Sequence, residues 1–446
     1  MPPRKKQNGI PANAIILGFT GSLGSGCSYI AEGIAKELTE YKFVSLSAPI
    51  YEKAGTGAQK SELQDIGDEL RREHGRSFFA KEAIDRLKSS GETHKKIIIN
   101  SIRNDQEVLY LRQFPNFYLF SIYAPRDVRF KRLKKKHYGE DRSSFDKDDE
   151  RDSKNIDPFG QQVSKCNYLA DIVINNQDIP PSSRIRKRNF IQEIISRYVK
   201  LIEDGPSVEL RPSMDETLMT MAYCESLGSS CLQRKVGAII ATEDGHVIST
   251  GKNDVPKNQG TCKEEYNRCY RNYVKELHAS KLKHCPNCGT KIEMTPYDCP
   301  HCKSEGRGHK LSQYYRNCPD CAQELIPSYQ CPECGISVFD QFVPGGKGSP
   351  GKLLDVCRSL HAEENAIIKL SKIGGVSSEN KILYTTTYPC TLCANKIVEI
   401  GISRVVFAEP YTMPEVEELF RAKKIKVDKF EGVKSRAFFR LYGEGL

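Results

Sequence analysis

The sequence of 446 residues predicts an α/β protein with two domains, the first built on a parallel sheet. Three observations lead to this prediction. Apolar stretches of strand length alternate with helical patterns over residues 13–203, as in a parallel sheet covered by helices. A glycine-rich segment joins the first strand to the first helix. A second series of strands and helices follows a Gly-Pro break at residues 205–206, and four cysteine pairs interrupt it.

The first domain is expected over residues 13–203, after a basic tail at residues 1–12 that has no predicted structure. Strands are predicted at 14–20, 42–46, 96–100, 117–122 and 172–174, and helices around 30–38, 61–73, 78–89, 126–135 and 190–202. The segment from Tyr138 to Asn155 is so polar that we expect a mobile lid or a solvated loop there.

The glycine-rich segment fits the phosphate-loop pattern G-x-x-x-x-G-K-[ST] except at Cys27, which stands where the lysine belongs. The missing lysine argues against efficient phosphoryl transfer, whereas the backbone amides and a hydroxyl remain available for binding. The candidate nucleotide-binding residues are Gly21, Gly24, Gly26, Cys27 and Ser28. A nucleotide held there would be accompanied by Mg²⁺. The alternative is a glycine turn that only packs a helix on the sheet.

The second domain is expected over residues 213–446, after a linker at 204–212. A helix at 215–227 precedes two strands, 236–241 and 246–250, which form a hairpin.

Two motifs of the second domain combine zinc ligands with a spare carboxylate. The first, H-x-E, contains His361 and Glu363, and the second, P-C-x-x-C, contains Cys390 and Cys393. One imidazole and two thiolates leave a fourth position on zinc for water, as in catalytic sites. Glu363 lies close to the metal without being a ligand, so it is free to carry protons. The alternative, a structural site, usually takes four ligands from compact knuckles, whereas these ligands come from two distant segments.

An insertion at residues 283–345 contains four C-x-x-C pairs, the spacing of zinc ribbons. Its ligand candidates are Cys285, Cys288, Cys299, Cys302, Cys318, Cys321, Cys331 and Cys334. Pairing neighbouring knuckles gives two structural four-cysteine sites, which loop-closure entropy favours over interleaved pairing. Such ribbons bind nucleic acid or partner proteins, or serve only as struts.

The H-x-E and P-C-x-x-C motifs together are typical of zinc nucleobase deaminases. Their order after Gly251-x-Asn253, and before Gly401-Ile402-Ser403-Arg404-Val405 and Tyr411, makes residues 213–420 resemble deoxycytidylate deaminases. The resemblance implies a mixed sheet between helices, a homohexamer, and dCMP or dCTP as substrate. It also implies that Asn253, Asn365 and Tyr411 contact the substrate. By the same resemblance, a further structural zinc would be held by Cys231, Cys262, Cys269 and Cys357. The alternative is that these cysteines are buried thiols that bind no metal.

The first 200 residues loosely resemble nucleoside-monophosphate and dephospho-coenzyme A kinases. The expected fold is therefore an N-terminal kinase-like P-loop domain followed by a cytidine-deaminase-like α/β/α domain with inserted zinc ribbons. This pairing resembles bacterial antiphage deoxycytidine-nucleotide deaminases. Because Cys27 replaces the lysine, we expect the first domain to bind a nucleotide without turning it over and so to regulate the second domain. That resemblance also implies depletion of deoxycytidine nucleotides and control by a small RNA.

Composition excludes some classes of protein and leaves two other functions open. The apolar runs are too short to span a membrane, and cysteines in ligand spacings indicate a reducing, cytoplasmic setting. The formal charge of +10 falls to about +4 if three four-cysteine zinc sites each remove two charges, which gives little support for a nucleic-acid partner. One alternative is nevertheless a base deaminase acting on tRNA or single strands recruited by the ribbons. The other is a nucleotide-sensing scaffold without activity.

Overall fold

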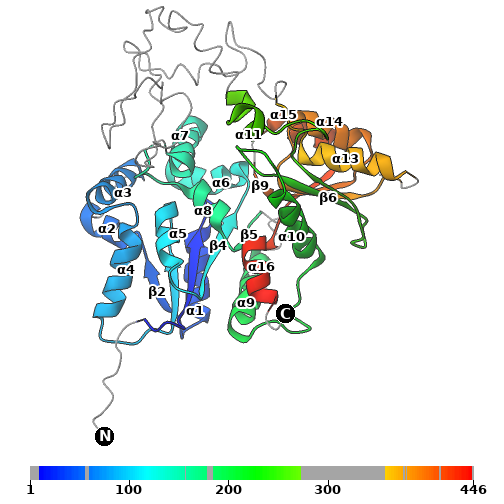
Figure 1. Ribbon diagram of the computed structural model, residues 1–446. Coiled ribbons are helices and arrows are strands. Elements are labelled where there is room, and N and C mark those ends of the chain that lie inside the picture. The colour runs from blue at the N-terminus through cyan, green and yellow to red at the C-terminus, as the bar shows by residue number, and fades with distance from the viewer. Residues whose placement is uncertain are drawn as a thin grey trace, which may run out of the picture. The chain divides into compact units, whose positions relative to one another are not determined.

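The computed structural model describes residues 10–55, 60–155, 157–177, 184–272, 357–374, 377, 379–410 and 413–443 (Figure 1). The chain divides into two compact units, each of which is described by itself. The first unit contains residues 1–221, 406–412 and 427–446, and the second contains 222–405 and 413–426. The predicted boundary at 204–212 stays a prediction, and the structure adds that a C-terminal segment belongs to the first unit.

The first unit is organised on a sheet with the strand order β11-β5-β4-β1-β3-β2 among the described residues. Its strands are β1 (Ile15–Thr20), β2 (Lys42–Ser45), β3 (Lys96–Asn100), β4 (Phe117–Tyr123), β5 (Ile172–Asn175) and β11 (Gly432–Val433). Strands β1 to β5 pair in parallel, and β11 pairs antiparallel with β5. The five strands predicted in this half of the chain are all present, which confirms the parallel α/β sheet.

Helices follow the strands of the first unit in alternation, as the sequence predicts. They are α1 (Cys27–Glu37), α2 (Ala48–Ala54), α3 (Lys60–His74), α4 (Phe78–Ser89), α5 (Asp105–Leu111), α6 (Arg126–Leu133), the π-helix η1 (Lys134–Tyr138), α7 (Arg142–Lys154), α8 (Val163–Leu169), α9 (Arg184–Asp204) and α16 (Ser435–Tyr442).

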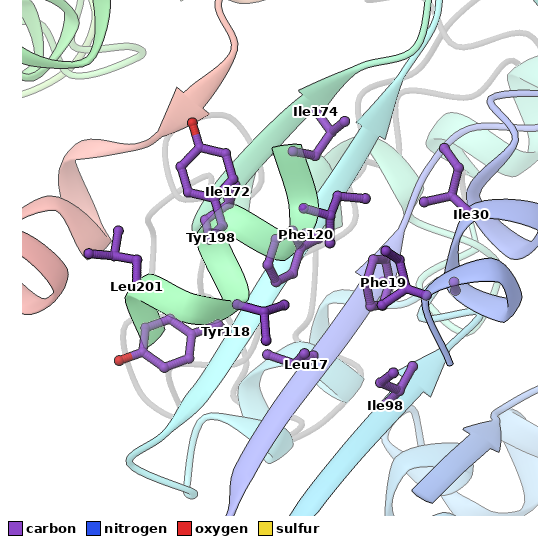
Figure 2. Packing of buried hydrophobic residues seen from close by; sticks show 14 of the residues in the cluster. Leu17, Phe19, Ile30, Ile98, Tyr118, Phe120, Ile172, Ile174, Tyr198 and Leu201 are labelled. Carbon is purple, nitrogen blue, oxygen red and sulfur yellow. The ribbon is translucent and has the colours of Figure 1, made fainter. Parts of the chain in front are cut away.

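Both faces of this sheet are buried, because successive side chains of a strand point to opposite sides. In β1, Leu17 and Phe19 belong to one apolar cluster and Ile16 to another. Figure 2 shows the first cluster, in which the ring of Phe19 stacks on that of Phe120 with centroids 5.1 Å apart. Helices α1, α9 and α16 contribute to the first cluster and helices α4, α5 and α8 to the second.

The polar segment expected as a mobile lid or loop is instead largely helical, since α7 covers Arg142–Lys154. Asp141 caps this helix by accepting a hydrogen bond from the Ser144 amide at 3.0 Å. Arg142 pairs with Asp146 one turn later, and Phe145 is fully buried. One buried aromatic side chain, a capping residue and local ion pairs therefore stabilise a helix here, although the sequence has no hydrophobic periodicity that would predict one.

Glu216 connects the first turn of helix α10 (Met214–Leu227) to the C-terminal segment of the first unit. Its carboxylate is 1% exposed and accepts hydrogen bonds from the backbone amides of Ser213, at 2.8 Å, and Val433, at 2.8 Å. It also accepts from the hydroxyls of Ser213, Tyr198 and Tyr442 at 2.9, 3.2 and 3.1 Å. The bonds to Ser213 form a capping box, whose S-x-x-E pattern is visible in the sequence. The others attach α9, β11 and α16 to this helix end.

Lys429 is a buried cation of the first unit. Its side chain donates to the carbonyl of Ala408 and its ammonium lies 5.6 and 5.8 Å from the ring centroids of Tyr123 and Phe407. Burial lowers the pKa of Lys429 from 10.5 to about 8.

We expect this lysine to make stability rise with pH between about pH 8 and 10.5. In that window the unfolded chain binds one proton more at Lys429 than the folded chain does, so each pH unit adds about 1 kcal/mol to the free energy of unfolding. Urea unfolding of the wild type and of Lys429→Met at several pH values measures this. The variant should lack the increment, and parallel pH profiles for both proteins would contradict the assignment.

The second sheet has the order β10-β9-β8-β6-β7 among the described residues. Its strands are β6 (Gly237–Ala241), β7 (Val247–Lys252), β8 (Ile382–Thr387), β9 (Arg404–Glu409) and β10 (Lys426–Lys429), and most residues of β9 and β10 are among those assigned to the first unit. The helices of the second unit are α11 (Cys262–Tyr266), α13 (Ala362–Ile373), α14 (Thr391–Glu399), α15 (Pro414–Ala422) and the second half of α10. Strand β6 pairs antiparallel with both β7 and β8, so the predicted hairpin is present.

Helix α13 packs directly on β7 and β6. Gly251 permits this contact, since a Cβ there would lie 2.0 Å from the Ala362 carbonyl oxygen and 2.5 Å from the Ala366 amide nitrogen. The start of α13 is thereby held against the sheet. The predicted fold class, a parallel P-loop sheet with a second α/β part, is confirmed. In the described part of the chain, every helix is too short or too polar to cross a bilayer.

Candidate metal centre and active site

Two helix starts bring the predicted metal ligands together. His361 and Cys390 are the N-cap residues of α13 and α14, both with extended backbone, and Cys393 lies in the first turn of α14. The ligand atoms of these three side chains all lie within 4.8 Å of one another. Among the described residues, this is the one cluster of three or more His, Cys, Asp or Glu ligand atoms at such spacing.

The donor geometry fits a zinc ion. The Nδ1 atom of His361 lies 3.3 Å from the sulfur of Cys390 and 3.3 Å from that of Cys393. Tetrahedral zinc with bonds of roughly 2.3 Å to sulfur and 2.1 Å to nitrogen would separate nitrogen from sulfur by about 3.6 Å. The two cysteines and the histidine would therefore bind the ion with little rearrangement, and Nδ1 is the ring atom that faces it.

The charges in the cluster also suit a metal. The Cys393 thiol and the His361 ring, both within hydrogen-bonding reach, lower the pKa of the Cys390 thiol to about 4. The Cys390 thiolate in turn raises the pKa of His361. A thiolate is the form of cysteine that binds zinc, so at least one sulfur is ready to bind at neutral pH.

Glu363 lies beside the cluster and is not one of its three members. Its carboxylate is 4% exposed, with Oε2 3.6 Å from the Cys393 sulfur and Oε1 3.3 Å from the hydroxyl of Thr385. Burial raises the pKa of Glu363. A carboxyl with a raised pKa close to a metal can both accept and return a proton, which is the behaviour of a general acid and base.

Sequence reasoning did not identify Thr385, which lies in β8 and is fully buried. Its hydroxyl lies 2.9 Å from the Thr387 carbonyl oxygen and 3.3 Å from Glu363 Oε1, so its single hydrogen can be donated to one of these two acceptors at a time. The run Thr385-Thr386-Thr387 before Pro389-Cys390 was the available signal, since consecutive hydroxyls on a buried strand need partners.

Two residues expected to contact the substrate are engaged within the fold. The amide oxygen of Asn253 accepts hydrogen bonds from Ser229 and from the Val236 amide, and its nitrogen donates to the Arg234 carbonyl. Asn253 thus shapes the loop before β6, and the second hydrogen of its amide nitrogen is the donor left for a sugar oxygen. Asn365 donates to the Lys252 carbonyl at 2.7 Å. Tyr411 lies outside the described residues.

Only some of the remaining predicted zinc ligands lie among the residues that the structure describes. The eight cysteines of the four knuckles lie outside the described residues. Cys231, Cys262, Cys269 and Cys357 are free and partly buried. Burial raises the pKa of Cys357, and the neighbouring Cys231 and Cys269 raise it further. A structural zinc at these cysteines stays a prediction.

The phosphate loop follows β1 with the expected turn geometry. Gly24 and Gly26 have φ values of 79° and 87°, which glycine tolerates best, and Gly26 is the N-cap of α1. Burial raises the pKa of the Cys27 thiol to about 12, which favours the thiol over the reactive thiolate at neutral pH. An internal anion contacts this loop, since Asp152 of α7 accepts a hydrogen bond from the Leu23 amide at 3.1 Å and one from Arg103 at 2.5 Å.

Comparison with known proteins identifies the family of the second part. Residues 212–409 match the family model described as the cytidine and deoxycytidylate deaminase zinc-binding region. The second part of the chain is therefore similar to the zinc-binding region of cytidine and deoxycytidylate deaminases. The protein is a deaminase, and the match together with the histidine and cysteine cluster supports zinc as its metal.

Some relatives of this deaminase match most of the chain, and others match half of it or less. A deoxycytidylate deaminase of Saccharomyces cerevisiae is 25% identical over 333 residues, which are 74% of this chain and 77% of the yeast protein. A UPF0200 protein of Methanothermobacter thermautotrophicus is 24% identical over 162 residues, 35% of this chain and 80% of that protein. A crystal structure of dCMP deaminase from cyanophage S-TIM5 shares 17% identity and a TM-score of 0.26, over 49% of this chain and 99% of that one.

Proposed function

We propose that the deaminase converts deoxycytidine nucleotides, dCMP or dCTP, into deoxyuridine nucleotides and ammonia. The observation that carries this proposal is the buried Glu363 carboxyl beside three zinc-ligand atoms within 4.8 Å of one another. The yeast relative is named for deoxycytidylate, which supports a free nucleotide over a polynucleotide as substrate.

In the proposed reaction, His361, Cys390 and Cys393 hold the zinc, which would activate a water molecule for attack on C4 of the cytosine ring. Glu363 takes a proton from that water and delivers it to N3 of the ring. It then transfers the second proton to the amino group as the C4–N bond breaks, so water and an amine become a carbonyl and ammonia. The Thr385 hydroxyl is a hydrogen-bond donor within reach of the carboxylate during both transfers.

The substrate class is tested by incubating the protein with dCMP, dCTP, cytidine, a deoxycytidine-containing oligonucleotide and tRNA. Chromatography with mass detection identifies which molecule gains a uracil, and ammonia release measures the rate. We expect turnover of one or both deoxynucleotides and none of the polymers. Deamination confined to the oligonucleotide or the tRNA would overturn the proposal in favour of a nucleic-acid base deaminase.

We also propose that the first unit binds a regulatory nucleotide at Gly21, Gly24, Gly26 and Ser28, with Mg²⁺, and does not transfer phosphate, because Cys27 replaces the lysine. Consumption of deoxycytidine nucleotides would deprive a replicating phage of DNA precursors. We further propose that the protein assembles as a homohexamer and that a small RNA controls its activity. Two to three structural zinc ions accompany the catalytic one, so elemental analysis should find more than one zinc per chain.

A further inference from the structure

One carboxylate connects the two helices that carry the metal ligands. Glu364 is the third residue of α13, and its Oε2 accepts a hydrogen bond from the backbone amide of His361 at 3.3 Å. Its Oε1 accepts from the Lys396 ammonium of α14, three residues after Cys393. The two helices pack on each other, and Figure 1 shows them side by side. Glu364 therefore contacts the backbone of one ligand residue and the helix that carries the other two.

The contact with the amide of His361 holds the backbone from which the imidazole extends. His361 has the extended conformation of a helix N-cap, with φ −75° and ψ 159°, so its amide lies outside the hydrogen-bond ladder of α13. A carboxylate at the third position of a helix is a typical acceptor for such an amide. Nδ1 of the same residue lies 3.3 Å from both cysteine sulfurs, so a shift of this backbone would displace a metal ligand.

The ion pair between Glu364 and Lys396 acts locally. The two side chains are 22% and 43% exposed, and ion pairs in contact with water contribute little to the stability of a whole fold. The three ligands, however, are divided between the two helices, with His361 at the start of α13 and both cysteines at the start of α14. Any separation of the two helix starts opens the cluster, and the ion pair opposes that movement.

We propose that Glu364 and Lys396 are positioning residues of the metal centre, which keep the three ligands assembled and slow the loss of zinc. Groups that orient metal ligands without binding the ion change metal affinity by about 10- to 100-fold when they are removed. This inference rests on the proposed zinc site of the deaminase, and it does not depend on which nucleotide is the substrate.

Zinc release from the full, zinc-loaded chain tests the role of this ion pair. A chromophoric chelator in excess measures the release. The kinetic phase that is missing from Cys393→Ala belongs to this centre, rather than to the other predicted zinc sites. We expect Lys396→Met to release this zinc at least about tenfold faster than the wild type. Lys396→Arg retains the cation and should release it at nearly the wild-type rate.

Lys369→Met is the matched control. Lys369 lies on the same helix α13, but its ammonium pairs with Glu225 of α10 at 3.4 Å. Its side chain is 49% exposed, close to the value for Lys396. The substitution removes a similarly exposed ion pair that does not connect α13 to α14, so zinc release should stay at the wild-type rate.

A double-mutant cycle shows whether Glu364 and Lys396 act through each other. In the Glu364→Ala background, Lys396→Met should change the rate of zinc release by less than about twofold, because the carboxylate with which it pairs is already absent. Release at the wild-type rate from Lys396→Met would refute the proposal, and so would equal acceleration in both backgrounds or by Lys369→Met. Identical release from Cys393→Ala and the wild type would remove the zinc centre itself. A chain that deaminates none of the deoxynucleotides would overturn the proposed substrate, whereas the release rates would still decide the role of the ion pair.

Discussion

Replacing Glu363 by alanine is expected to lower the rate of dCMP deamination by about 10²- to 10⁴-fold. The carboxyl is buried and lies beside the described cluster without being one of its three metal ligands. The zinc content should stay unchanged, because His361, Cys390 and Cys393 remain. Ammonia release and elemental analysis of the same preparation measure the two quantities.

Glu399→Ala is a suitable control for this experiment, because Glu399 lies exposed at the end of α14 and contacts none of the three metal ligands. It should deaminate at the wild-type rate. Full activity of Glu363→Ala would remove the proton-transfer assignment. Loss of zinc together with activity would instead make Glu363 part of the metal site.

Glu216→Ala is expected to lower the free energy of unfolding of the first unit by about 3–5 kcal/mol. The substitution leaves two backbone amides and three hydroxyls without their common acceptor, and those of Val433 and Tyr198 are buried. The amide of Val433 loses its bond to the carboxylate, so its protection against hydrogen exchange should fall more than that of amides in β1. Urea unfolding and exchange measured by mass spectrometry report both effects.

Glu209→Ala is the matched control, since Glu209 is exposed in the same unit and should change stability by less than about 0.5 kcal/mol. If Glu216→Ala and Glu209→Ala unfolded at the same urea concentration, the carboxylate would not hold the C-terminal segment in place.

Local pattern was sufficient to predict the central strands and the metal cluster. Buried strands such as β3, with the sequence KIIIN, are short apolar runs between polar segments and need no distant information to be recognised. The ligands could be found because zinc coordination restricts residue type and spacing, so His361, Cys390 and Cys393 identify one another across nearly thirty residues. The geometry then followed from placing each motif at the start of a helix.

The features that sequence reasoning missed depend on contacts between distant segments. Asp152 accepts from the Leu23 amide over 129 positions, and neither residue carries a local sign of the other. The two residues of β11 are too few for any strand pattern, and only their pairing with β5 defines them. Gln64 is an ordinary polar residue of α3 in the sequence, and only the structure shows that its amide is buried without a hydrogen-bond partner among the described residues.

Strand β11 has a consequence for how the protein is made. A ribosome releases strands β1 to β5 long before residue 432 is added, so the nascent first sheet waits with the edge of β5 unpaired while the entire second sheet is synthesised. Premature termination after the catalytic cysteines would leave that edge open and would remove Val433, Ala437 and Leu441 from the core. Only chains translated past residue 441 can therefore complete the core of the first unit.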